Sequence, residues 1–198
     1  MRKIVFLLAF LNIAFADQLR NEVRNGYTPP PTSNIKVEHI NSNGVNITVR
    51  YPRSVYAGEY FTVHASMTNN IDYARMGGLT LSFPQYTSMN ADILSKRFDK
   101  LNGYLPPSKL YSKVYNRNIP IDYYVIEGWE NKWHYGARKH MKLQFKAPYS
   151  INQIDVNVRG VLVFGSGRSK EEVAVPLNGM VRDQQGYAVR TIAIRVLK

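Results

Sequence analysis

The chain has 198 residues, of which 44% are hydrophobic, 20% charged and 12% aromatic, and its formal net charge is +12. The hydrophobic fraction is too high for a disordered chain. The sequence contains no cysteine, which excludes a disulfide scaffold, thiol chemistry and cysteine-based zinc sites. At this length we expect one domain, or at most two small ones.

Residues 1–16 have the pattern of a secretory signal peptide. Arg2 and Lys3 precede an apolar run from Ile4 to Leu11, and Ala14-Phe15-Ala16 matches the small-x-small cleavage pattern. The run is shorter than the roughly 20 apolar residues of a membrane span, so we expect no transmembrane span in the mature chain. The alternative is an uncleaved first helix. The pattern predicts an extracytoplasmic protein (periplasmic, cell-surface or secreted) that begins near Asp17.

Residues 17–34 have the composition of a tether. The segment contains Asn25-Gly26 and the run Pro29-Pro30-Pro31, with few apolar residues to anchor it. Consecutive prolines favour an extended polyproline II course without ladder hydrogen bonds. We therefore expect a Pro-rich N-terminal tether before the folded domain, which we place at residues 35–198.

From residue 35 onward the hydrophobic period is mostly two, the period of β-strands with one buried face. Val45, Ile47 and Val49 alternate with polar residues, and Asn43-Gly44 before them predicts a hairpin turn. The expected strands up to Pro84 cover residues 35–40, 45–50, 60–68 and 79–83.

One stretch has a helical period instead. Leu94, Phe98 and Leu101 are spaced by four and three residues, which is the spacing of an apolar helical stripe. Asn102-Gly103 is suited to end such a helix. We expect a helix inserted near residues 89–101.

The remaining strands are expected at residues 109–116, 121–127, 139–146, 154–164, 171–175 and 187–197. About ten strands separated by turn signals are typical of an antiparallel β-sandwich. The predicted fold class is therefore mostly β, an antiparallel immunoglobulin-like sandwich with one inserted helix.

The stretch from Ser54 to Asn70 resembles a pattern in bacterial immunoglobulin-like modules. Gly58-Glu59 forms the turn, Phe61-Thr62-Val63 lies in the strand that follows, and Thr68-Asn69 ends it. The last strand, after Asp183-Gln184-Gln185-Gly186, is similar to the last strand of such modules. The resemblance covers roughly 35 residues and implies a fold class, because function does not follow from fold alone.

The strongest candidate binding site is an aromatic cluster in residues 126–136. Trp129, Trp133 and Tyr135 are expected to form a platform on which sugar rings stack. The alternative is that one or both tryptophans belong to the sandwich core. Glu127 and Glu130 are spaced too closely across a predicted turn to indicate a glycosidase pair.

The basic residues are concentrated in the middle of the chain. Residues 17–95 hold six basic and six acidic side chains, whereas residues 96–146 hold eleven and four. Alternation along an expected strand places a candidate polyanion-binding stripe on one face, with further basic residues close by: Lys109, Tyr111, Lys113, Tyr115, Arg117, Arg138 and Lys139. The alternative is a solvated face that keeps the protein soluble.

No catalytic or metal-binding motif is recognisable. Gly165-Ser166-Gly167 does not match a nucleophile elbow, because the motif requires a glycine two positions before the serine and Phe164 stands there. We expect a hairpin turn instead. His39, His64, His134 and His140 lack the close spacing of a zinc pair. We expect no cofactor and no metal, although an enzyme site assembled from distant residues stays open.

Three function classes follow. The first is an exported, non-enzymatic β-sandwich that binds or assembles with a macromolecule at the cell envelope, either a protein or an anionic polymer. The second is a glycan-binding module that uses the aromatic platform and its basic neighbours. The third is an enzyme. Nucleic acid is not an expected partner, because the signal peptide directs the chain out of the cytoplasm.

Overall fold

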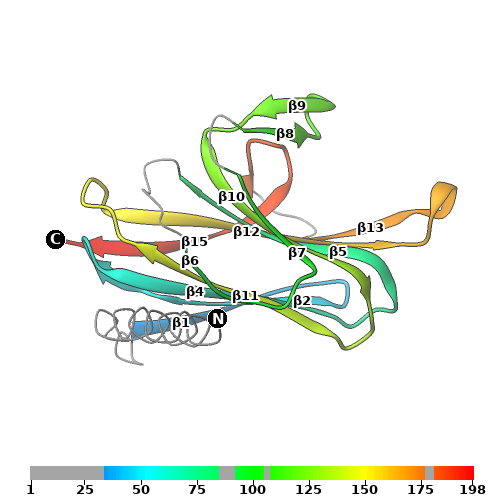
Figure 1. Cartoon of the computed structure of the whole chain (residues 1–198), viewed down its shortest axis with the longest axis horizontal. Helices are drawn as coiled ribbons and strands as arrows, with labels where there is room; N and C mark the ends of the chain where they lie inside the picture. The colour runs from blue at the N-terminus through cyan, green and yellow to red at the C-terminus, as the bar shows by residue number, and fades with distance from the viewer. Residues whose placement is uncertain (1–33, 85–91, 105–107, 177–180) are drawn as a thin grey trace, which may run out of the picture. The chain divides into compact units, whose positions relative to one another are not determined.

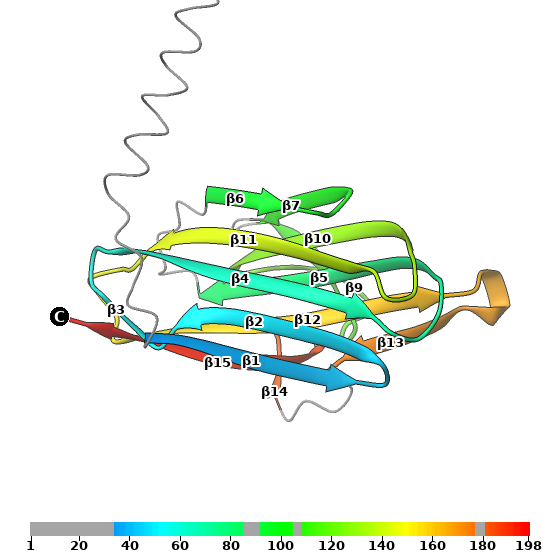
Figure 2. The ribbon, with the colours of Figure 1, turned by 90° about the horizontal axis from the view of Figure 1, so that it is seen from below.

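The chain folds into strands whose side chains alternate between buried and exposed, joined by short polar turns. The computed structural model describes residues 34–84, 92–104, 108–176 and 181–198. The predicted signal peptide and almost all of the predicted tether lie outside these residues. The first sheet has five antiparallel strands, shown side by side in Figure 2, in the order β1 (Ile35–Ser42), β2 (Val45–Pro52), β4 (Tyr60–Asn69), β11 (Arg138–Lys146) and β6 (Asp92–Lys96).

The second sheet has eight strands. Its main path runs through β14 (Val181–Arg182), β15 (Ala188–Leu197), β12 (Gln153–Phe164), β5 (Ala74–Pro84), β10 (Tyr123–Trp133) and β7 (Lys100–Tyr104). β13 (Glu171–Val175) pairs with β12, and β3 (Ser54–Tyr56) pairs in parallel with β15. A short 3₁₀ turn, η2 (Gly167–Ser169), lies between β12 and β13.

The two sheets pack face to face around one hydrophobic core, which makes the fold a β-sandwich. Figure 1 shows β1, β2 and β4 in one layer and β12 and β15 in the other. A separate hairpin of β8 (Lys109–Ser112) and β9 (Arg117–Pro120) stands on the outer side of the second sheet.

Period-two alternation places the core residues. Val45, Ile47 and Val49 of β2 are fully buried, as are Val63 of β4 and Leu143 of β11 in the same sheet. In the second sheet the inward side chains include Leu79, Leu81, Val156, Val158 and Ile194. Burial of this apolar surface is the main favourable term in folding. The predictions of a mostly β chain and of these alternating strands are confirmed.

The turn chemistry also agrees with the sequence. Asn43 and Gly44 both have positive φ angles (44° and 77°), as a two-residue type I′ hairpin requires, and they join β1 to β2. Gly165 and Gly167 likewise have positive φ in the connection between β12 and β13.

The predicted helix near residues 89–101 is wrong for the residues that the structure describes. Asp92–Lys96 and Lys100–Tyr104 are strands, paired with β11 and β10 respectively. Phe98 lies between them and is buried against Gly128 and Trp133. The apolar spacing that suggests a helix thus arises from a turn that inserts one ring into the core, while strand pairing with both sheets overrides the local period. Met89–Ala91 lie outside the described residues.

Within the described residues, no helix has the length and apolar character of a membrane span. These residues belong to one compact unit, Ser33–Lys198. All strand pairs are antiparallel except β3 with β15.

Candidate functional site

The outer face of the eight-stranded sheet carries a row of polar side chains across three central strands. Strand register places Glu127 of β10 opposite Thr80 of β5, and Thr80 opposite Arg159 of β12. Two residues further along the strands, on the same face, Trp129 of β10 is opposite Gly78 of β5, and Gly78 is opposite Val161 of β12. Polar residues on the middle strands of a sheet need hydrogen-bonding partners, and here the chain supplies a cover above them.

Arg159 is the centre of the polar row. Its side chain is only 13% exposed, and its Nη2 donates to Gln185 Oε1 at 3.0 Å and lies 3.4 Å from Glu127 Oε1. Its Nε lies 3.4 Å from Asp183 Oδ2 but makes no hydrogen bond. The guanidinium also stacks on the Tyr187 ring, 3.8 Å from the centroid. The carboxylates of Glu127 and Asp183 therefore compensate the charge of Arg159, and the Tyr187 ring helps to fix the orientation of its guanidinium.

The turn between β14 and β15 and the β8–β9 hairpin form the cover. Gln185 is buried and its Nε2 donates to the carbonyl of Tyr111 at 2.6 Å. The Gln185 carbonyl accepts from the Lys113 backbone N–H at 2.8 Å and from the Ser112 hydroxyl at 3.2 Å. These bonds hold the hairpin against the turn, so a single glutamine connects the cover to Arg159.

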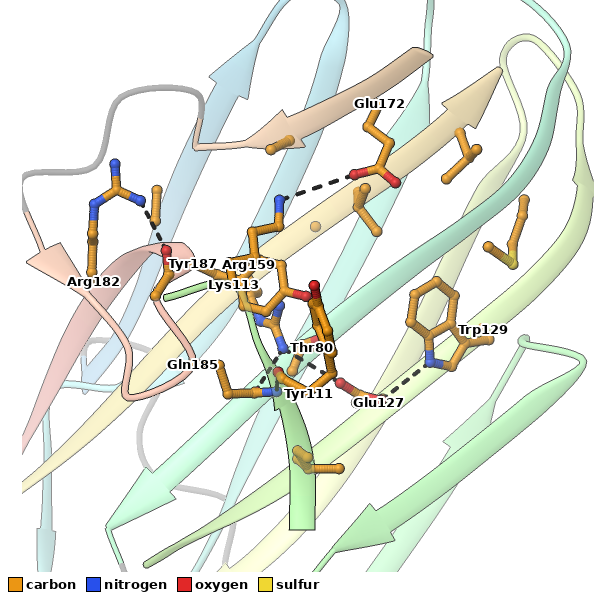
Figure 3. Close-up of a pocket in the computed structure, with 18 residues that line it drawn as sticks. Thr80, Tyr111, Lys113, Glu127, Trp129, Arg159, Glu172, Arg182, Gln185 and Tyr187 are labelled. Carbon is orange, nitrogen blue, oxygen red and sulfur yellow. Dashed lines mark hydrogen bonds and ion pairs between the residues drawn. The ribbon is translucent and has the colours of Figure 1, made fainter. Parts of the chain in front are cut away.

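Between the cover and the sheet is a pocket of about 470 Å³ (Figure 3). Three aromatic side chains line it, Trp129 from the sheet and Tyr111 and Tyr187 from the cover. The Trp129 indole lies over Gly78, and its Nε1 donates to Glu127 Oε2 at 3.2 Å. This volume is typical of a site for one small ligand.

Most of the charged groups around the pocket are paired with one another, and Glu172 also pairs with Lys170. Its lining includes three cations and two carboxylates, Arg159, Lys113, Arg182, Glu127 and Glu172. Asp183 adds a third carboxylate behind Arg159. Lys113 Nζ lies 4.6 Å from the Tyr187 ring centroid and 4.0 Å from Glu172. A pocket with paired charges and aromatic walls is suited to an uncharged ligand with many hydroxyl groups.

Burial raises the pKa values of three groups at or near the pocket. Burial raises the pKa of the Asp183 carboxyl, and the nearby Arg159 and the backbone N–H groups of residues 185–187 only partly offset this effect. Burial likewise raises the pKa values of Tyr123 and Tyr187, which stay protonated. The two phenols are therefore hydrogen-bonding groups and not bases.

The three predicted platform residues occupy three different environments. Trp129 lines the pocket, Trp133 is fully buried in the core, and Tyr135 is 70% exposed in the turn after β10. Lys132 has a left-handed backbone (φ 60°), which interrupts the alternation and turns Trp133 to the inner face. The Trp133 indole packs on Phe98, and its Nε1 donates to the Ala137 carbonyl at 2.9 Å. The structure does not assemble a common platform.

The predicted basic stripe is likewise divided. Lys109–Ser112 is a strand, but residues 113–116 form a turn, so Lys109 and Arg117 lie on two antiparallel strands of a hairpin. Tyr111 donates to Asn116 across this hairpin, and Tyr115 is exposed in the turn. Only Tyr111 and Lys113 of the stripe reach the pocket.

The last two residues of the stripe belong to the other sheet. Arg138 and Lys139 lie on β11, where Arg138 donates to the Ser66 hydroxyl at 2.7 Å and Lys139 pairs with the buried Glu130. The sequence analysis predicted one strand over residues 109–116, but the strand ends at Ser112 and residues 113–116 form a turn.

The other chemical candidates are also separated. Glu127 lies in the pocket, whereas Glu130 is buried and pairs with Lys139, so they do not form a carboxylate pair. His64 and His140 stack edge to face at 5.4 Å on the five-stranded sheet, and His134 contacts Tyr73. Among the described residues no group of three or more His, Asp or Glu side chains is arranged to bind a metal.

The sequence reading missed most of the pocket. The sequence does not indicate Thr80, Arg159 and Tyr187 as site residues, and it indicates Asp183 and Gln185 only as part of a segment before the last strand, because strand register and a distant turn bring these residues together. Two signals are present in the sequence: Arg159 continues the polar face of β12 after Asp155 and Asn157, and Gly77-Gly78 interrupts β5.

The described residues thus form a β-sandwich with a lined pocket on one outer face. No protein-family model matches the sequence, and neither does any curated protein sequence. Among solved structures, the C-terminal domain of wzt is 11% identical at a TM-score of 0.34, with 87% of this chain and 81% of that chain covered.

Two further solved structures are similar at the same level. A chain of the Coh-OlpA–Doc918 type I cohesin–dockerin complex from Clostridium thermocellum is 6% identical at a TM-score of 0.34, covering 82% of this chain and 99% of that chain. AvmM, which catalyses macrocyclization in alchivemycin A biosynthesis, is 7% identical at a TM-score of 0.38, covering 83% and 89%. TM-scores this low say nothing about function.

Proposed function

We propose that this protein is an exported, non-enzymatic β-sandwich that binds a glycan at the cell envelope, and that the pocket on its eight-stranded sheet receives an uncharged sugar unit. The observation that carries this proposal is the position of Trp129. Its indole lies over Gly78 on the sheet surface, beside the Glu127–Thr80–Arg159 row and at the wall of a pocket of about 470 Å³.

Sugar recognition combines the two properties that this pocket has. The apolar face of a pyranose stacks on an aromatic ring, while its hydroxyl groups need donors and acceptors fixed in direction. Trp129 supplies the ring, Thr80 and Glu127 supply a hydroxyl and a carboxylate beside it, and the buried Gln185 amide holds Arg159 in place. Arg159 is already held by Glu127, Gln185 and Asp183, so these groups are preorganised before a ligand arrives.

The pairing of charges within the pocket supports an uncharged ligand over an acidic one. Arg159 faces two carboxylates, and Lys113 lies between Glu172 and the Tyr187 ring. A carboxylate or phosphate group in the pocket would meet Glu127 at close range, and like charges in a half-buried site repel strongly.

Export is part of the proposal and depends on the sequence of residues 1–16. The charged start, the apolar run and Ala14-Phe15-Ala16 support a cleaved signal peptide. The absence of cysteine means that the exported domain depends on core burial and not on disulfides for its stability.

The test is a glycan-array screen with a variant in which the pocket is blocked. Ala174 lines the pocket and Ala193 is an exposed alanine of the same sheet outside it, so Ala174→Trp and Ala193→Trp form a matched pair. We expect wild type and Ala193→Trp to retain the same neutral glycans and Ala174→Trp to lose them. Equal retention by all three proteins would refute the pocket as the binding site.

A further inference from the structure

The outer face of the five-stranded sheet is a second surface of distinct chemistry. Its outward positions on β1, β2, β4 and β11 carry mostly hydroxyl, amide, imidazole and cationic side chains, with Val37 and Tyr60 as exposed exceptions, and none of them carries a carboxylate. We call this surface the basic face and define it by four cations and two histidines, Arg50, Arg138, Lys142, Lys146, His64 and His140.

The cations of the basic face are regularly arranged. β11 places Arg138, Lys142 and Lys146 at every fourth residue, which in an extended strand corresponds to a repeat of about 13 Å. Across the strands, Arg50 and Lys142 flank His64 in one register row, so their backbones lie about 10 Å apart. The face therefore presents three cations in a row along β11, with Arg50 beside this row on β2.

These cations are not neutralised within the described part of the chain. Arg138 donates to the Ser66 hydroxyl, and Lys146 Nζ lies 5.7 Å from the Tyr60 ring centroid. None of the ion pairs among the described side chains involves Arg50, Arg138, Lys142 or Lys146. At the edge strand β6, the register sets Asp92 opposite Gln144, at the Lys146 end of the row.

The two histidines respond to this concentration of charge. Burial lowers the pKa of His64, and His140, Arg138, Arg50 and Lys142 lower it further. Burial and the nearby Arg97 and Arg138 lower the pKa of His140 in the same way. His39 of β1 is hydrogen-bonded to Thr48 on the same face. Burial is thus the largest cause of both shifts, and the cations of the basic face add to it.

We propose that the basic face binds a linear acidic polysaccharide, laid along β11, as a second site separate from the pocket on the opposite sheet. A linear polyanion matches a row of cations that form no ion pair among the described side chains, and the hydroxyl and amide groups between them, such as Thr48, Ser66 and Gln144, match its sugar hydroxyls.

Other polyanions fit this face less well. A membrane-binding face carries apolar or aromatic side chains that enter the lipid interface, but here the outward positions are mostly polar. Single-stranded nucleic acid needs several exposed aromatic platforms, whereas the described outward positions of these four strands carry one tyrosine, Tyr60, whose ring lies against Lys146. A flat sheet face also does not enter the grooves of a duplex.

The test compares two double variants of equal net charge. Arg50→Gln with Lys142→Gln removes two cations from the basic face, whereas Lys109→Gln with Arg117→Gln removes two exposed cations from the β8–β9 hairpin. The probe is a size-defined heparin oligosaccharide, and a soluble polygalacturonate is the second probe. We expect binding by the face variant to be about tenfold weaker, with a shallower salt dependence, and binding by the hairpin variant to match wild type.

Equal weakening by both variants would overturn the proposal, because net charge alone would then explain the attraction. Binding to anionic lipid vesicles or single-stranded DNA that is lost with the face variant, without binding of either polysaccharide, would also overturn it. An NMR titration of the wild-type imidazoles is independent of variant folding. We expect bound oligosaccharide to raise the pKa values of His64 and His140, and unchanged values would contradict the proposal.

Discussion

Trp129 and Gly78 are directly opposite one another on neighbouring strands, and the indole lies over the glycine. A Cβ at position 78 would stand 2.9 Å from two indole carbons. The adjacent Gly77 lies under the Trp133 indole on the inner face, although Trp133 itself pairs with Ala74, and a Cβ at position 77 would stand 2.4 Å from the indole and 2.6 Å from Leu162. Two consecutive glycines thus accommodate both tryptophans of the chain, one on each side of the sheet.

This arrangement predicts opposite effects for two adjacent substitutions. Gly78→Ala moves the Trp129 indole at the rim of a pocket, so sugar binding should weaken while unfolding changes little. Gly77→Ala overpacks the core and should lower the free energy of unfolding by about 1–3 kcal/mol. Urea unfolding and sugar titration of both variants check this. A Gly78→Ala protein with unchanged affinity would show that the indole position does not matter for binding.

The two tryptophans should also differ on truncation. Trp133 is fully buried, so Trp133→Ala should destabilise the fold by about 3–5 kcal/mol. Trp129→Ala should remain folded and lose glycan retention. Tyr135→Ala, which removes an exposed aromatic ring outside the pocket, is the control for both measurements. Severe unfolding of Trp129→Ala would place that indole among the structural residues.

Asp183 predicts a pH dependence of stability. Burial raises its pKa above the usual 3.8, so the folded state binds the proton more tightly than the unfolded state does. The contribution of this carboxyl to stability is therefore greatest at low pH and declines as the pH rises through the raised pKa, by about 1.4 kcal/mol per unit of pKa shift.

Asp183→Asn keeps a side chain of the same shape and removes the titration. We expect wild type to lose stability relative to this variant as the pH rises from about 3.8, in urea unfolding measured at a series of pH values. If wild type instead gained stability over this range, the attraction of Arg159 would outweigh burial and the pKa would be lowered.

The histidines of the basic face predict that polysaccharide binding depends on pH. Their pKa values lie below the usual 6.5 in the free protein, and a bound polyanion favours the protonated form. Binding therefore takes up protons, and affinity for the heparin oligosaccharide should rise several-fold as the pH falls from about 7.5 to about 5.5. His64→Gln with His140→Gln should abolish most of this rise, as calorimetry at several pH values would reveal. A rise of the same size in the double variant would assign it to other groups.

The sequence was informative where structure is local. Alternation in β2, β4, β12 and β15 predicted both the strands and their inward faces, because burial on one face of a strand imposes a period of two. Asn43-Gly44 predicted its hairpin because few other residues accept two positive φ angles.

The site was not predictable to the same extent. Glu127, Thr80 and Arg159 are far apart in the sequence, and only the register of β10, β5 and β12 brings them together. Gln185 reaches the site from a turn that also holds the β8–β9 hairpin. Phe98 contributed to a false helical period because a turn, and not a helix, inserts it into the core.

The central claim is that the pocket beside Trp129 binds sugar, and the indole N–H signals test it most directly. The chain has two such groups: that of Trp129 donates to Glu127 in the pocket, and that of Trp133 donates to Ala137. Titration of ¹⁵N-labelled protein with the best-retained glycan should shift the Trp129 signal in a saturable manner and leave the Trp133 signal in place. An unmoved Trp129 signal at saturating glycan would contradict the account.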